Sequence, residues 1–247
     1  MSLDLSALAT HYGKSRNLLP PLHLGTRYDR AGVFLPEAGN TVVCHLISGS
    51  ETERVLMQAQ VRYRDMADAT GLAFTPVESY HMTLFQGIIE GRRNHPYWPA
   101  DLAADTPIDE MTRQFKRRLD SFPALPDFAV RATMALPTGL VVEGATAADR
   151  HAMAAWRDAF AEAFGYRHPD HDSYQFHITM AYMIDWLDDA ALPSWQAMLD
   201  EVLDDITRRA PVLELRAPAF CSFEDMNWFE ELLVLEAKQL VAATGSA

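Results

Sequence analysis

ESYHMTLFQGI at residues 78–88 and YQFHITMAYMI at residues 174–184 are the two most informative segments of this 247-residue chain. Both are apolar runs that contain β-branched and aromatic residues, a composition typical of strands. Each run also contains one His-x-Thr unit. The two segments therefore predict a matched pair of strands that carry the same polar motif.

The two motifs put polar side chains on one face of each strand. Residues two apart in a strand point to the same face, so His81 shares a face with Thr83, and His177 shares a face with Thr179. The residues that alternate with them are apolar, and we expect these to pack against helices. Each strand thus offers an imidazole and a hydroxyl on the face away from the core.

Further strands and helices are predicted around each motif in the same order. Ser50 with Glu53, and Thr146 with Asp149, mark helix starts. In the first half, strands are predicted at 41–47, 78–88 and 128–136, and helices at about 51–70 and from 106 onward. In the second half, strands are predicted at 139–145, 174–184, 212–220 and 229–237, and helices after residue 146 and at about 193–209.

The repeated order predicts an α+β fold with a pseudo-twofold axis. His177 follows His81 by 96 residues, and the first strand of the second half follows that of the first half by 98. Matching order and near-equal offsets indicate an internal duplication. We expect two small antiparallel-rich sheets that meet at this axis, with helices outside.

The predicted organisation has two parts. Residues 1–39 are expected to form an irregular N-terminal segment with a short helix, which could serve as a lid or as a surface strap. Residues 40–247 are expected to form a single bilobal domain, with a first half at about 40–137 and a second half at about 138–237.

Composition limits the classes of function. The formal net charge is −13, and an acidic surface disfavours binding to long nucleic acid without excluding a small phosphorylated ligand. No apolar run of the roughly 20 residues needed to span a bilayer is present, and the N-terminus does not resemble a signal peptide. We therefore expect a cytoplasmic protein. Cys44 and Cys221 lie in apolar contexts and are expected to be buried free thiols.

The histidines of the two motifs could also have a structural or a metal-binding role. One His on a strand is more often a core or surface residue than a catalytic one, but two His-x-Thr units at equivalent places in a repeat weaken that reading. Histidine is also the commonest metal ligand. Here no carboxylate or third His recurs at a fixed spacing in both repeats, so we predict no metal site.

The units HMTLF and FHITM resemble the paired signature motifs of the two-histidine (2H) phosphoesterase superfamily. The run GNTVVCHL followed by SYHMTLFQG resembles a bacterial branch, the DUF1868 group, over most of residues 25–235. This resemblance implies a bilobal catalytic domain with a central cleft. It also implies that the catalytic residues are those of the two motifs, listed in chain order as His81, Thr83, His177 and Thr179.

Two histidines across a cleft can divide acid–base work, one removing a proton while the other donates one. The threonines would donate hydrogen bonds to phosphate oxygens. We expect metal-independent, cofactor-free cleavage of a cyclic or 2′–5′ phosphodiester of a nucleotide or short oligonucleotide. Which histidine is the base stays open.

Two other functions remain open. The cleft could belong to a non-catalytic binding module for a phosphorylated ligand, or to an RNA-end ligase, which should show a basic groove. For the preferred phosphodiesterase function we expect a monomer with a small phosphorylated partner, without long nucleic acid or a membrane.

Additional contacts to substrate are predicted at Arg27, Tyr28 and Phe85. Asp172 could orient His177. Other arginines and aromatic residues are weaker candidates, because most such side chains are solvated or in the core: Arg62, Arg92, Arg93, Tyr97, Trp98 and Trp228.

Overall fold

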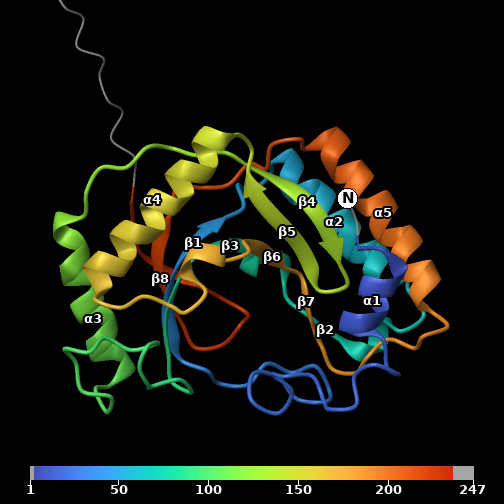
Figure 1. Cartoon of the computed structure of the whole chain (residues 1–247), viewed down its shortest axis with the longest axis horizontal. Coiled ribbons are helices and arrows are strands. Elements are labelled where there is room, and N and C mark those ends of the chain that lie inside the picture. Colours follow the sequence, from blue (N-terminus) through green and yellow to red (C-terminus); the bar gives the residue numbers. More distant parts are fainter. Residues whose placement is uncertain (1–2, 236–247) are drawn as a thin grey trace, which may run out of the picture.

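The computed structural model describes residues 3–235, which form an antiparallel sheet flanked by two groups of helices (Figure 1). The predicted α+β class is confirmed. The helices are α1 (Leu5–Tyr12), α2 (Glu51–Arg64), α3 (Ile108–Arg118), α4 (Ala147–Phe164) and α5 (Leu192–Arg209). The strands are β1 (Gly39–His45), β2 (Leu72–Phe74), β3 (His81–Ile89), β4 (Val130–Leu136), β5 (Gly139–Gly144), β6 (His177–Thr179), β7 (Ala181–Met183), β8 (Ala219–Phe223) and β9 (Glu230–Val234).

The two predicted sheets are joined into one. Seven strands lie in the order β4-β5-β6-β3-β1-β8-β9, and β2 pairs separately with β7. The halves of the chain meet where β3 pairs with β6, so neither strand leaves an unpaired edge of backbone groups. Apart from β9 at one edge, the order is symmetric about this junction, because β4 of the first half lies beside β5, and β8 of the second half lies beside β1.

The helices also pair across the two halves, so that each pair contains one helix from the first half and one from the second. α3 and α4 contact each other and pack on β1 and β3, whereas α2 and α5 contact each other on the β4 side (Figure 1). Two of the predicted helix starts are confirmed by their caps. The hydroxyl of Ser50 accepts a hydrogen bond from the amide of Glu53 at the start of α2. Thr146 forms a reciprocal capping box with Asp149 at the start of α4.

A β-bulge interrupts the alternation of β3. Val42 of β1 pairs with Phe85 and Val43 pairs with Thr83, so Leu84 is one extra residue on β3. Leu84 and Phe85 are both fully buried as a result. The bulge therefore turns Phe85 into the core and the next residue, Gln86, toward the same side as Thr83.

Two predicted strands have different bounds. The run 174–184 divides at Met180, whose amide donates to Thr138 O and whose carbonyl accepts from Thr75 N, so that β6 joins the main sheet and β7 joins the small one. The strand predicted at 212–220 begins only at Ala219. Pro218 directly precedes it and has no amide hydrogen for a ladder.

The N-terminal segment is attached by hydrogen bonds to distant elements. Between α1 and β1, residues 13–38 contain only turns and isolated bridges. The hydroxyl of Tyr28 donates to Met183 O at 2.7 Å, and the amide of Glu37 donates to Glu224 O at 2.8 Å. The segment therefore borders both β7 and the loop after β8. Across residues 3–235, no helix has the length and apolar character needed to cross a bilayer.

Candidate active site

The middle of the main sheet brings the two His-x-Thr units together. Met82 lies directly opposite Ile178 in the β3–β6 pair, and both side chains are fully buried. Antiparallel pairing then sets the histidine of each unit beside the threonine of the other. All four polar side chains emerge on the face opposite these two apolar residues.

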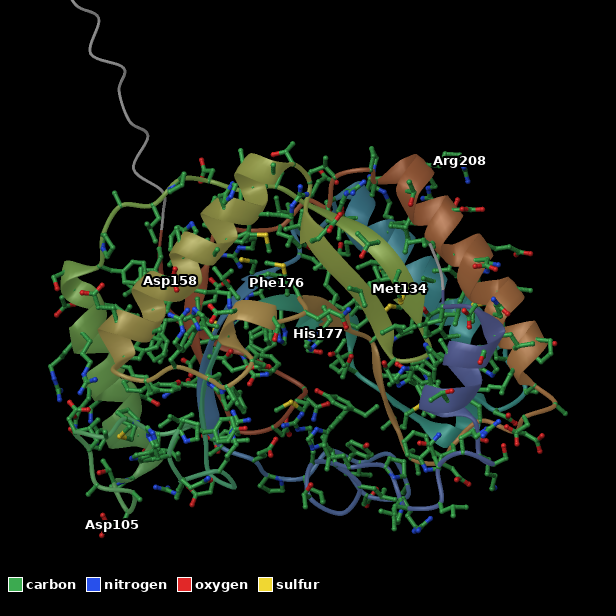
Figure 2. The ribbon with its side chains drawn as sticks, viewed as in Figure 1. Asp105, Met134, Asp158, Phe176, His177 and Arg208 are labelled. Carbon is green, nitrogen blue, oxygen red and sulfur yellow. The ribbon has the colours of Figure 1, made fainter. Side chains whose placement is uncertain are left out.

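These four side chains line one cavity of about 200 Å³. Figure 2 labels His177 near the centre of the molecule, between the two groups of helices. His81 and His177 are diagonal neighbours across the strand pair, a relationship that typically separates two residues by roughly 7–8 Å and their Cβ atoms by somewhat less. A phosphate group can therefore lie between the two imidazoles.

The two imidazoles are oriented in the same way. Nδ1 of His81 lies 2.6 Å from the carbonyl oxygen of Ser79, and Nδ1 of His177 lies 3.1 Å from that of Gln175. A carbonyl oxygen can only accept, so Nδ1 carries the hydrogen in both rings. Each histidine in its neutral form therefore keeps an unprotonated Nε2 for a ligand.

His81 lies in an apolar surrounding. The ring of Phe229 is 4.2 Å away, and that of His45 is 6.0 Å away. Burial lowers the pKa of His81 to about 3, and the nearby imidazoles of His45 and His177 act in the same direction. His81 is therefore neutral at neutral pH, with Nε2 able to accept a proton.

Two arginines line the cavity, and one of them is already paired with a carboxylate. Nε of Arg27 lies 2.7 Å from Glu37 Oε2, and its guanidinium lies 5.6 Å from the ring of Tyr182. Arg92 lies 4.3 Å above the ring of Tyr97, and its buried Nε has no hydrogen-bond partner among the described residues. None of the described residues that line the cavity is Asp or Glu. The described lining itself thus adds no carboxylate, and Arg92 can meet an anion there although the net charge of the chain is −13.

Two predicted substrate contacts are corrected by the structure. Phe85 is fully buried against Phe160 and Phe164 of α4, because the bulge turns it away from the face that strict alternation predicted. Tyr28 is only 2% exposed, and its ring lies 5.3 Å from that of Tyr182. Tyr28 therefore lies behind Tyr182 at this cavity, and it lines instead the adjoining hollow that contains Leu22 and Trp186.

The orienting role predicted for Asp172 is also wrong. Its carboxylate forms an ion pair with Arg167, and Nδ1 of His177 uses the carbonyl of Gln175 instead.

The weaker candidates lie mostly elsewhere. Arg62 pairs with Glu201, Arg93 pairs with Glu90, and Trp98 is buried. Trp228 is exposed outside the cavity, and Tyr97 lies under Arg92. Only Arg92 of this group lines the cavity.

Several lining residues had no clear signal in the sequence. Gln86 lines the cavity because the bulge changes the direction of its side chain. Tyr182 lines it because the strand is interrupted at Met180, between β6 and β7. Met226 and Phe229 come from the loop between β8 and β9, which folds over His81 from a distant part of the chain.

The described residues contain no cluster of candidate metal ligands, and both cysteines are free thiols. Among residues 3–235, no three His, Cys, Asp or Glu side chains converge in an arrangement that could hold a metal ion. Cys44 and Cys221 are buried free thiols, as predicted, and burial raises the pKa of both.

Comparisons with known proteins agree with the motif reading. A family model labelled 2H-phosphodiest and described as "Domain of unknown function (DUF1868)" matches residues 27–141. The chain is also similar to a crystal structure of the conserved protein of unknown function ATU0111 from Agrobacterium tumefaciens str. C58. The two are 52% identical over 95% of this chain and 99% of that chain, with a TM-score of 0.91. No curated protein matches.

Proposed function

Because this chain belongs to the DUF1868 family of 2H phosphodiesterases, we propose that it hydrolyses a cyclic or 2′–5′ phosphodiester of a nucleotide or short oligonucleotide. The proposed catalysis needs no metal ion and uses His81 and His177 as its acid–base pair. One observation carries the proposal: the Met82–Ile178 pairing delivers both His-x-Thr units to a cavity that contains two arginines and, among the described residues, no carboxylate.

The proposed step divides the proton transfers between the histidines. Nε2 of neutral His81 takes a proton from water as the water oxygen attacks phosphorus. The bond between phosphorus and the departing oxygen breaks, and protonated His177 gives its Nε2 proton to that oxygen. The products are a phosphomonoester and a free hydroxyl, and exchange with solvent restores both imidazoles.

His81 is assigned as the base because burial keeps it neutral in the free protein. A bound phosphodiester anion stabilises the imidazolium form and so raises the pKa of His81 during the reaction. Thr83 and Thr179 each lie beside the histidine of the other unit and would donate hydrogen bonds to the non-bridging oxygens. Arg27 and Arg92 would hold further negative charge of the substrate.

The test uses EDTA-treated protein with four 2′,3′-cyclic nucleotides and a 2′–5′ dinucleotide. We expect turnover that His81→Ala or His177→Ala lowers by about 10²–10⁴, since each replaces one acid–base group. His151→Ala is a matched control, because His151 is an exposed histidine on α4 outside the cavity.

Other outcomes of this panel would contradict the proposal. Turnover that EDTA abolishes and metal restores would disprove the metal-free mechanism. Binding of the nucleotides without turnover by the folded wild-type protein would indicate a non-catalytic binding module.

A further inference from the structure

A second hollow of about 550 Å³ adjoins the cavity that contains both His-x-Thr units. The two share four lining residues: His23, His177, Thr179 and Tyr182. His81, Thr83 and both arginines line only the first cavity. His177 is therefore the one catalytic histidine that borders both spaces, and we call the second space the His177 groove.

The walls of the His177 groove come from three distant parts of the chain. Pro21 and Leu22 belong to the N-terminal segment, Met134 and Leu136 to β4, and Trp186 follows β7. The indole nitrogen of Trp186 donates to Leu19 O at 2.7 Å, which ties the N-terminal segment to this wall. The groove is thus formed by the tertiary fold rather than by one loop.

The chemistry of the His177 groove differs from that of the first cavity. None of its described lining residues is Asp, Glu, Lys or Arg. The wall combines apolar side chains such as Leu136 and Trp186 with neutral polar ones such as Gln175, and Leu22 is 86% exposed. A large exposed leucine beside a catalytic site is suited to covering an apolar part of a ligand. Among the described lining residues of the two spaces, Arg27, which is paired with Glu37, and Arg92 are the arginines, and both line the first cavity.

We propose that the His177 groove binds the departing alcohol of the phosphodiester, and that this alcohol is an uncharged group with a large apolar face. The inference rests on the proposed function and adds a direction to it. In an in-line displacement, the attacking and departing oxygens lie on opposite sides of phosphorus. Water beside His81 therefore places the departing oxygen beside His177, and the rest of the alcohol extends into the groove.

Two kinds of alcohol share this chemistry. A nucleoside has a neutral, flat base that can lie against Trp186 or Tyr182, and an alkyl or aryl alcohol has only apolar surface. Both would exclude water from His177 and would contact the apolar wall. Phosphate esters of an alkyl alcohol, an aryl alcohol and a nucleoside distinguish these two kinds of alcohol.

The experiment compares the affinities of phosphate monoesters for the full chain by calorimetry. The probes are methyl phosphate, hexyl phosphate, phenyl phosphate and adenosine 3′-phosphate. A fully buried methylene is worth about fourfold in affinity. We expect hexyl and phenyl phosphate to bind about ten- to a hundredfold more tightly than methyl phosphate. A still larger gain for adenosine 3′-phosphate would identify a nucleoside as the alcohol.

Variants test whether the groove is the source of this gain. The double variant Leu22→Asn, Met134→Asn should lose most of the gain while binding methyl phosphate as the wild type does. Leu18→Asn is the matched control, because Leu18 is 91% exposed and does not line the groove.

Three results would overturn the inference. Equal affinity for all four esters would leave the phosphate site standing and remove the groove from substrate binding. A gain that persists in the double variant would place the alcohol elsewhere. No binding of any ester, together with no turnover of phosphodiesters, would reject both this inference and the proposed function.

Discussion

The carbonyl oxygen of Leu84 accepts a 2.8 Å hydrogen bond from Nη1 of Arg157 on α4. Leu84 is the extra residue of the β3 bulge, so its carbonyl lacks a regular ladder partner. Arg157 is only 4% exposed, and its guanidinium also donates to His171 O and lies 4.2 Å from the ring of Tyr174. This buried arginine therefore stabilises the irregularity that turns Phe85 into the core and Gln86 toward the cavity.

Replacing Arg157 by Met should destabilise the fold and the site together. The change leaves two buried carbonyls without a donor, at about 1–3 kcal/mol each, so we expect the free energy of unfolding to fall by about 2–6 kcal/mol. We also expect kcat to fall, because the bulge directly follows Thr83 and turns Gln86 toward the cavity. Urea unfolding and steady-state kinetics measure the two effects. Arg150→Met on the same helix is the control, with a change below about 1 kcal/mol, because Arg150 is exposed. An unchanged unfolding midpoint for Arg157→Met would refute this account of the bulge.

Gly87 should not tolerate a side chain. A β-carbon at this position would overlap the backbone and side-chain oxygens of Asn40, a buried residue of β1. We expect Gly87→Ala to lower the free energy of unfolding by about 2 kcal/mol or more, since the two strands would have to separate. Gly91→Ala is the matched control, because a β-carbon there meets nothing within 4 Å. Thermal or urea unfolding compares the pair, and similar losses in both variants would contradict the prediction.

Neighbouring arginines should differ in their effect on substrate affinity. Arg92 lines the cavity, whereas Arg93 pairs with Glu90 and lies outside it. Removing a charge-assisted hydrogen bond to an anion costs about 1.5–3 kcal/mol, so Arg92→Gln should raise KM by about tenfold or more. Arg93→Gln should change KM by less than about twofold. Steady-state kinetics at two salt concentrations makes the measurement, and equal KM values for the two variants would exclude Arg92 from substrate binding.

His168 should make stability depend on pH. Its Nε2 donates to Gln86 O at 3.0 Å, and burial, together with the nearby charge of Arg92, lowers the pKa of His168 to about 4. The unfolded chain binds a proton near pH 6.5 that the folded chain does not. The contribution of His168 to stability is therefore complete above pH 6.5 and is lost as the pH falls toward 4.

The matching variant is His168→Gln, which keeps a donor for Gln86 O. We expect its free energy of unfolding to fall less steeply with decreasing pH, by up to about 1.4 kcal/mol per pH unit. Urea unfolding between pH 7.5 and 4.5 compares the slopes. Parallel curves for the two proteins would show that His168 does not carry this dependence.

The sequence by itself determined the elements and the strands that carry the two motifs. Caps, apolar periodicity and His-x-Thr alternation depend on residues within one or two turns of each other, so they can be read without coordinates. The α+β class, the starts of α2 and α4 and the shared face of His81 and Thr83 were predictable for this reason.

Only the tertiary structure decided how the halves join and what surrounds the motifs. The bulge that buries Phe85 depends on the pairing partner Val42, and the division at Met180 depends on hydrogen bonds to Thr75 and Thr138. Phe229 reaches His81 from a loop well over a hundred residues away in sequence. Such contacts depend on pairing register and on long-range packing, and the local pattern of a single strand contains no information about either.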